Sequence, residues 1–289
     1  MHRLAALLFI PLLTPPSAPA QSTAAPAIDP TALVRRAVAH RTESDAHHLP
    51  LRYLLHKTEQ RHGITRDTTK EIIETKDGDV ARLIAIDGKP LPPDADRAEL
   101  DRLDTLAAHP DLQEHRHKSE QRDAARINHL MELLPQAFLY RVEGVVPCSA
   151  GQCYRLSFTP NPRFSPPDLE ADVLRGIAGE VWIDRAQERL TRLNAHFITD
   201  VDFGFGLLGK LNKGGTVLLE QTDIGAPMHD WELTGLHLDL TGKALMVKSI
   251  EMQVNEETSH FSPAPPNLTY RDAIQLLKKS SATAATSTH

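Results

Sequence analysis

Apolar side chains recur at every second position in a series of short segments that begins at residue 51, and this alternation limits the fold more than any other feature of the chain. In the first segment, Leu51, Tyr53 and Leu55 fall on one side of the alternation. A period of two places successive side chains on opposite faces of a β-strand, so each segment predicts a strand with one buried face. Asp77-Gly78 and Asp87-Gly88 between early segments favour tight antiparallel turns.

At least eight antiparallel strands are expected in total. The candidate segments are a run from residue 51 and residues 65–75, 82–86, 138–145, 153–158, 180–184, 189–197, 217–222, 231–240 and 244–254. Residues 241–243, with the sequence Thr-Gly-Lys, are expected to form the turn before the last of them. A sheet this long must curl to cover its apolar face, so the sequence predicts an α+β fold with a large curved antiparallel sheet and helices packed on it.

Helices are expected at both ends of this domain. Asp29-Pro30 has the composition of an N-cap followed by proline in the first turn, which predicts a helix over residues 31–41 that buries Leu33, Val34 and Val38. Residues 270–279 predict a short helix with Ile274 and Leu277 on one face. Residues 29–279 are thus expected to be one domain, between a disordered linker (21–28) and a disordered tail (280–289).

A charged helical insertion interrupts the strands at about residues 94–134. His109-Pro110 divides it into two helices, and Pro135 is expected to end the second. The first carries a stripe of Leu100, Leu103 and Ala107, and the second a stripe of Ile127, Leu130, Met131 and Leu134. Residues 114–126 are almost wholly polar, so this part is expected to be exposed to solvent or to project from the body.

The first twenty residues have the pattern of a secretory signal peptide. Arg3 precedes an apolar run over residues 4–13, and Ala18-Pro19-Ala20 has the spacing of a cleavage site. The apolar run is shorter than the roughly 20 residues that a membrane-spanning helix needs. The mature chain is therefore expected in the periplasm or outside the cell, with no transmembrane anchor after cleavage.

Two cysteines lie five positions apart, at Cys148 and Cys153, with small and polar residues between them. In an exported protein such a pair favours a disulfide that closes a hairpin. A redox-active pair is the alternative, but the spacing is not C-x-x-C and no thioredoxin-like pattern surrounds it.

The sequence offers little for catalysis, metal or nucleic-acid binding. A net charge of −6 without a basic block argues against a nucleic-acid partner. Residues 204–210 match the G-x4-G-K spelling of a phosphate loop, but Leu211 follows where a serine or threonine is needed. The fifteen histidines show no metal-site spacing, and His47-His48 is expected in a solvated loop. No G-x-S-x-G occurs. We therefore expect no enzyme activity, no cofactor and no metal.

The segment Gly179-Glu180-Val181-Trp182-Ile183-Asp184, followed by a polar turn and Arg189-Leu190-Thr191-Arg192-Leu193, resembles the LolA-like superfamily of exported lipoprotein-sorting proteins. It also resembles exported bacterial proteins of this strand order whose role is unknown. The likeness covers about residues 31–262. It implies an incomplete β-barrel with helices as a lid over an apolar cavity that holds acyl chains. The long polar insertion departs from the compact members of that superfamily.

An apolar loop and three apolar stripes are the candidate binding site. The loop, residues 202–209, places phenylalanine and leucine among glycines and is expected either as a lip beside a cavity or as a loop packed on the core. The candidate ligand-binding residues are Phe203, Phe205, Leu207, Leu208, Val217, Leu219, Leu236, Leu238 and Leu240, with a further stripe of Ile250, Met252 and Val254 on the concave face. The expected partner is a lipid or a lipoprotein acyl chain. The alternative is an envelope scaffold of the same fold, with a filled core and a protein partner.

Overall fold

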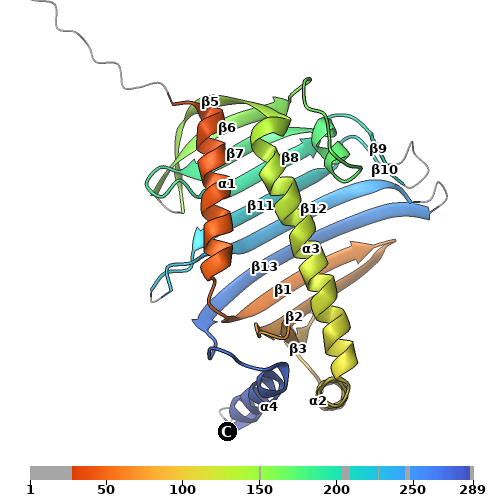
Figure 1. Ribbon diagram of the computed structural model, residues 1–289. Coiled ribbons are helices and arrows are strands. Elements are labelled where there is room, and N and C mark those ends of the chain that lie inside the picture. Colours follow the sequence, from red (N-terminus) through yellow and green to blue (C-terminus); the bar gives the residue numbers. More distant parts are fainter. Residues whose placement is uncertain (1–27, 150, 204–208, 227, 245–247, 287–289) are drawn as a thin grey trace, which may run out of the picture.

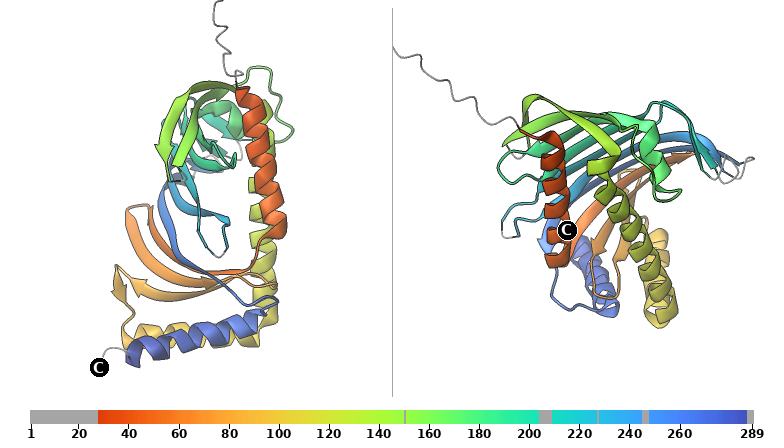
Figure 2. Two further views of the ribbon diagram at one scale, coloured as in Figure 1. Left: turned by 90° about the vertical axis from the view of Figure 1, so that its left-hand side faces the viewer. Right: turned by 45° about the horizontal axis from the view of Figure 1, so that its top comes forward.

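The computed structural model describes residues 28–149, 151–203, 209–226, 228–244 and 248–286. Within them, one large antiparallel sheet carries helices α1 and α3 across one face and helices α2 and α4 at one end (Figure 1). The sheet is strongly twisted and curved, and it is not closed (Figure 2). The predicted α+β fold with a curved antiparallel sheet is confirmed. The signal peptide, residues 21–27 of the linker and most of the predicted lip lie outside the described residues.

The sheet joins two blocks of the sequence. The order of its main strands is β4-β3-β2-β1-β13-β12-β11-β8-β7-β6-β5, and β9 and β10 form a small hairpin that pairs with β12. The first block is β1 (Leu51–Arg61), β2 (Ile64–Ile73), β3 (Val80–Ile86) and β4 (Lys89–Pro90). The second is β5 (Phe138–Cys148), β6 (Gly151–Pro160), β7 (Ile177–Asp184), β8 (Leu190–Phe197), β9 (Val201–Phe203), β10 (Gly209–Leu211), β11 (Thr216–Asp223), β12 (Trp231–Ala244) and β13 (Lys248–Pro263). The last strand, β13, returns to pair with the first, β1.

Helix α1 (Pro30–His47) begins as predicted, because the Asp29 carboxylate accepts hydrogen bonds from the backbone N–H groups of Thr31 and Ala32. It continues past the expected end at residue 41. Helices α2 (Pro93–Ala108) and α3 (Pro110–Ala137) follow the predicted break at His109. A short 3-10 helix, η1 (Ala171–Gly176), precedes β7, and α4 (Tyr270–Thr286) closes the chain.

Two separate apolar clusters hold the helices on the sheet. The first, which we call the α1 core, joins α1, the last turns of α3 and strands β5–β8, and it includes Leu33, Val34, Leu134, Leu156 and Ile183. The second, the α4 core, joins α4, α2 and strands β2 and β3, and it includes Ile73, Val80, Leu103, Ile274 and Leu277. The predicted buried face of α4 is confirmed, since Ile274 and Leu277 are fully buried.

Helix α2 covers one edge of the sheet. Glu99 Oε1 accepts a hydrogen bond of 2.8 Å from the backbone N–H of Leu83 in β3, and Arg102 donates one of 2.7 Å to the backbone carbonyl of Ala81. Glu99 and Arg102 also pair with each other. These two side chains therefore satisfy backbone groups of β3 that no neighbouring strand reaches at this point.

The first half of α3 is held by polar contacts. Gln113 Nε2 donates to the carbonyl of Asp77 (3.0 Å), and Glu120 accepts from the N–H of Asp79 (3.2 Å). Gly78 has φ +97° between them, and a Cβ there would lie 2.9 Å from Glu120 and His117, so glycine permits the close approach of the helix. Most of residues 114–126 are exposed, as predicted.

Besides the end of α1, four further sequence-based expectations are wrong. Pro135 lies inside α3, which continues to Ala137. Helix α4 runs to Thr286, because its alanine- and serine-rich end contains no proline or glycine to stop it. Residues 241–243 are not a turn but part of β12. Asp202 and Gly209, expected in a loop, lie in the paired strands β9 and β10.

The error at residues 241–243 has a specific cause. Gly242 lies opposite Leu211 of β10, and a Cβ on Gly242 would overlap the carbonyl oxygen of Lys210. Glycine is needed here for the close approach of two backbones and not for a turn, and a single sequence does not separate these two uses.

Candidate functional site

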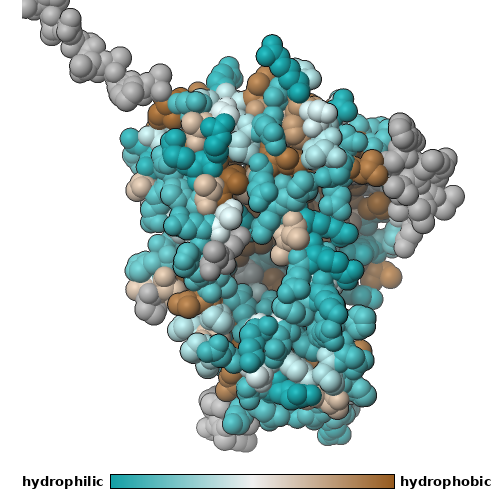
Figure 3. Space-filling view, viewed as in Figure 1, coloured by the Kyte–Doolittle hydropathy of each residue, from teal (hydrophilic) through white to brown (hydrophobic). Residues whose placement is uncertain are grey.

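A cavity of about 590 Å³ lies between α1, α3 and the face of the sheet that these helices cover, which we call the inner face. The volume falls within the roughly 300–1,000 Å³ that is usual for small-molecule sites. Figure 3 shows that the surface on this side is mainly hydrophilic and is hollowed between the two helices. The site is thus a recess under two helices that cross the sheet.

One face of α1 forms a wall of this cavity, and this wall changes from apolar to polar along the helix. Its lining residues follow helical spacing, so they share one side of the helix: Val34, Ala37, Val38, Arg41, Ser44 and, just after the helix, His48. The first half of this wall is apolar and the second half is polar. An α-helix rises about 21 Å over the fourteen steps from Val34 to His48, so the cavity has distinct apolar and polar ends.

Helix α3 supplies the opposite wall through Ala124, Ile127, Asn128 and Met131. Ile127 belongs to the predicted apolar stripe, yet it is 51% exposed. Its position on the cavity wall explains this, because the stripe turns from packed core at Met131 and Leu134 to an open recess at Ile127.

The inner face of the sheet forms the apolar floor. Ile183 of β7, Leu190 of β8, Leu219 of β11 and Leu236 of β12 all line the cavity. Leu219 pairs directly with Leu236 across the strands, so both side chains point to the same side.

Two arginines lie at the middle of the cavity. Arg189 donates to the carbonyl of His40 and, at 2.6 Å, to Ser44 Oγ. With its amide oxygen turned toward α1, Gln221 accepts from Arg41 Nη1 at 2.8 Å and donates to the carbonyl of Leu190 at 3.0 Å. These contacts hold both arginine side chains at the place where the apolar half of the α1 wall ends.

The polar end of the cavity is an ion-pair cluster around His48. His48 Nε2 lies 2.7 Å from Glu74 Oε2, and His48 Nδ1 lies 3.1 Å from Asp230 Oδ2 and 3.4 Å from Glu232 Oε1. Glu74 also accepts from the backbone N–H of Leu51 at 2.8 Å. The cluster joins the end of α1, the β2–β3 loop and the start of β12.

The carboxylates make His48 a cation at neutral pH. The hydrogen bond to Glu74, with the charges of Glu74 and Glu232 and the contact with Asp230, outweighs partial burial and raises the pKa of His48 to about 9. Nearby, burial together with the charges of Glu74 and Glu120 raises the pKa of Asp79 to about 7, against the effect of Arg116 and His48.

The same cluster has the residue types of a metal site. Ligand atoms of His48, Asp230 and Glu232 all lie within 4.8 Å of one another. An imidazolium has no lone pair to offer, however, and a metal ion would have to displace the proton that three carboxylates hold on the ring. We therefore describe the cluster as an ion pair network.

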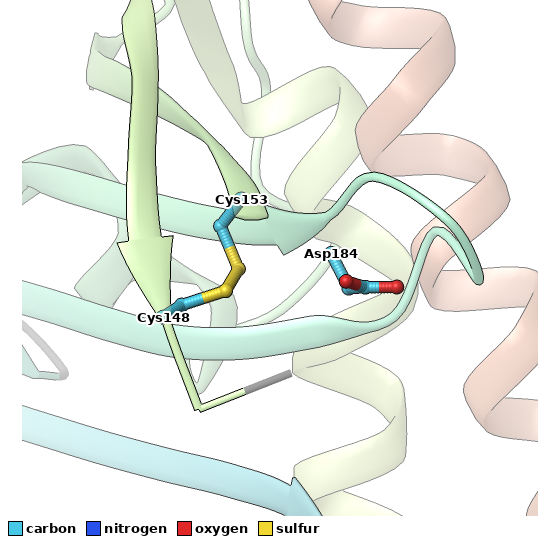
Figure 4. A group of neighbouring side chains, drawn as sticks. All are labelled: Cys148, Cys153 and Asp184. Carbon is cyan, nitrogen blue, oxygen red and sulfur yellow. A yellow bond between two sulfur atoms is a disulfide. The ribbon is translucent and has the colours of Figure 1, made fainter. Parts of the chain in front are cut away.

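A second group with metal-ligand residue types, Cys148, Cys153 and Asp184, has another explanation (Figure 4). The two sulfurs are bonded to each other, and the Cα atoms lie 5.9 Å apart, so the predicted disulfide is confirmed. The Asp184 carboxylate accepts hydrogen bonds from the backbone N–H groups of Ala186 and Gln187. It holds the turn between β7 and β8.

Some of the predicted ligand-binding residues line the cavity in the structure, and others do not. Leu219 and Leu236 line the cavity, and Val217 packs beside the α1 core. Across neighbouring strands, Val217 pairs with Leu238, Leu238 with Val254, and Leu240 with Met252. The predicted stripes therefore share the inner face. The residues that line the cavity do not include Leu238 or Leu240. Phe205, Leu207 and Leu208, and the side chain of Phe203, lie outside the described residues.

The sequence reasoning missed the polar half of the site. His48 was expected to be solvated, and its partner Asp230 is 182 positions away. The spacing of Arg41, Ser44 and His48 continues the stripe of Val34 and Val38, and this is the one signal that could have marked them.

No family model matches the chain, and no curated protein matches it in sequence. Solved structures do align with most of it. A DUF1329 family protein from Desulfovibrio piger aligns at 12% identity and TM-score 0.31, over 84% of this chain and 96% of its own. A LolA superfamily protein from Nitrosomonas europaea aligns at 7% identity and TM-score 0.30, over 83% and 95%. A domain assigned as an outer membrane lipoprotein-sorting protein in Vibrio parahaemolyticus aligns at 12% identity and TM-score 0.32, over 85% and 99%.

Two of these solved structures bear the names of the LolA-like, lipoprotein-sorting superfamily that the sequence resembles. Among the described residues, none of the helices combines the length and apolar character needed to span a bilayer.

Proposed function

We propose that this chain is an exported, non-catalytic binding protein that carries or senses a lipid or a lipoprotein acyl chain in the cavity under α1 and α3. The lining and the volume of the cavity are the observations that support this proposal. Its floor and the first half of its α1 wall are apolar, and its volume of about 590 Å³ suits one small amphiphile. Its polar groups begin at the middle, with Arg41 and Arg189, and continue to the His48 end, which suits a ligand with one apolar and one polar end.

Narrowing the cavity tests this proposal directly. Leu219→Trp would fill space above the floor, and we expect it to reduce the lipid that co-purifies with the protein, as measured by native mass spectrometry. Leu218→Trp is the matched control, because neighbouring positions of a strand point to opposite faces. Equal lipid content in the two variants, or no lipid in the parent protein, would contradict the proposal.

The alternative of an envelope scaffold with a filled core makes the opposite prediction. Such a protein would purify without lipid, and Leu219→Trp would change its stability without changing any bound molecule. The proposed lip gives a separate test: Phe205→Ser should weaken lipid binding more than it lowers the free energy of unfolding. If Phe205→Ser binds lipid as well as the parent does, the lip forms no part of the site.

A further inference from the structure

Acidic and basic side chains are equal in number among the described residues that line the cavity. The three basic ones are Arg41, Arg189 and His48, and the three acidic ones are Glu74, Asp230 and Glu232. His48 counts as a cation at neutral pH, because its carboxylate neighbours hold the proton on the ring. The lining therefore has no excess charge of either sign.

None of these six side chains is without a partner. Arg189 is bonded to Ser44, and His48 contacts all three carboxylates. Arg41 is bonded to Gln221. An ionised head group would lose its hydration on entering the cavity, and no net charge of the lining would compensate for that loss. A head group without charge avoids this cost.

Two neutral polar side chains face the cavity from opposite walls, Ser44 from α1 and Asn128 from α3. Asn128 is half-buried, and its amide makes no hydrogen bond with any residue that the structure describes. An amide offers both donors and an acceptor. The Ser44 hydroxyl accepts from Arg189 and keeps its own proton to donate. The two side chains therefore match a hydroxyl, an ester or an amide.

Resting on the proposed function, we propose that the cavity selects an amphiphile with an uncharged, hydrogen-bonding head, which Asn128 and Ser44 hold between α3 and α1. The acyl chain lies on Leu219 and Leu236. Two sources supply this head chemistry. One is the glycerol of a monoacylglycerol, and the other is the amide that joins an acyl chain to the N-terminus of a peptide.

Probes that share one acyl chain separate the head group from the chain. Isothermal titration calorimetry of the full mature protein would compare a monoacylglycerol and an uncharged N-acyl peptide amide with an anionic lysophosphatidylglycerol and a cationic alkylammonium, each below its micelle concentration. We expect at least one neutral probe to bind at least about tenfold more tightly than either charged probe.

The outcomes separate this inference from the proposed function. Preference for the monoacylglycerol supports a free lipid as the source, and preference for the peptide amide supports a lipoprotein. A charged probe that binds as tightly as the better neutral probe overturns the inference, while its binding still supports the proposed function. If none of the probes binds, the proposed function fails as well.

A near-isosteric variant gives the second arm. Asn128→Asp should weaken the better neutral probe at least about fivefold and strengthen the alkylammonium, because a carboxylate loses the amide donors and attracts a cation. Opposite changes for two ligands cannot result from misfolding alone. Asn194→Asp makes the same change at an exposed position of β8, on the face opposite to Leu219, and should alter neither affinity. If the two variants behave alike, or if both ligands change in the same direction, Asn128 does not hold the head group.

Discussion

The α1 core and the α4 core lie on one sheet, and among the described residues the cavity of about 590 Å³ is lined by members of the first core and by none of the second. In the α4 core, Ala273, Ile274 and Leu277 of the helix and Leu103 of α2 are all fully buried, so the helix closes against the strands. In the α1 core the fully buried section ends near Val38, and the same helical face continues with Arg41, Ser44 and His48. Where a helix places polar side chains toward a sheet, the two pack less closely, and the remaining space is an open recess.

The strongest test of this difference compares one leucine from each region. Leu277→Ala removes a fully buried side chain from a closed core and should lower the free energy of unfolding by about 2–5 kcal/mol. Leu219→Ala, at the wall of an existing cavity, should cost only about 1 kcal/mol, since less packing is lost. Urea denaturation measures both, and similar losses would show that the recess is as well packed as the α4 core.

Removal of the disulfide should have the next largest effect. Cys148→Ala/Cys153→Ala opens a small loop at the end of the β5–β6 hairpin, and the chain-entropy model predicts a loss of about 2 kcal/mol. The hairpin contributes Leu156 and Phe158 to the α1 core, so the loss should be seen there first. Hydrogen exchange that rises in β6 while α4 keeps its protection would support this, and uniform loosening would contradict it.

The polar end of the cavity should make stability depend on pH. His48 has a pKa raised from 6.5 to about 9 by Glu74, Asp230 and Glu232, so its contribution is complete below pH 6.5 and is lost as the pH rises through 9. Asp79 has a pKa raised from 3.8 to about 7, which also makes stability fall as the pH rises through 7.

The His48 side chain is 32% exposed, so solvent screening limits its effect to about 1–2 kcal/mol. Thermal unfolding between pH 6 and pH 9.5 measures the decline. His48→Gln should flatten the part above pH 7.5, whereas His229→Gln, at an exposed ion pair, should leave it unchanged. A parent protein with constant stability across this range would contradict the ion-pair description.

The smallest expected effect is local. Residues 114–126 of α3 are held by single polar contacts such as that of Glu120, whereas residues 130–137 pack on the α1 core. Hydrogen exchange should therefore be faster in the first half of α3 than in the strands around Trp182 and Trp231. Equal protection in the first half of α3 and in these strands would mean that the polar contacts hold this part of the helix as firmly as apolar packing does.

Local patterns predicted the parts of the fold that depend on neighbouring residues. Asp29-Pro30 marked the start of α1, and the two cysteines marked their disulfide. The alternation along β11 and β12 placed Leu219 and Leu236 on one face. The ion-pair cluster could not be predicted in this way, because His48 meets Asp230 only after the sheet has brought the end of α1 to the start of β12. The prediction of a turn at Gly242 was wrong for a related reason, since the role of this glycine depends on the distant Lys210.

The pair of Glu99 and Arg102 on α2 has a consequence for how copies of this protein meet one another. An uncovered edge strand is a template on which a second chain can add a strand, and repeated addition leads to aggregates. By bonding the N–H of Leu83 and the carbonyl of Ala81, the pair removes that template at β3. At the opposite edge, β5 carries Pro147 and a bulge between Val142 and Gly144, which interrupt the regular strand edge. The sheet is thereby protected at both edges against growth into a polymer.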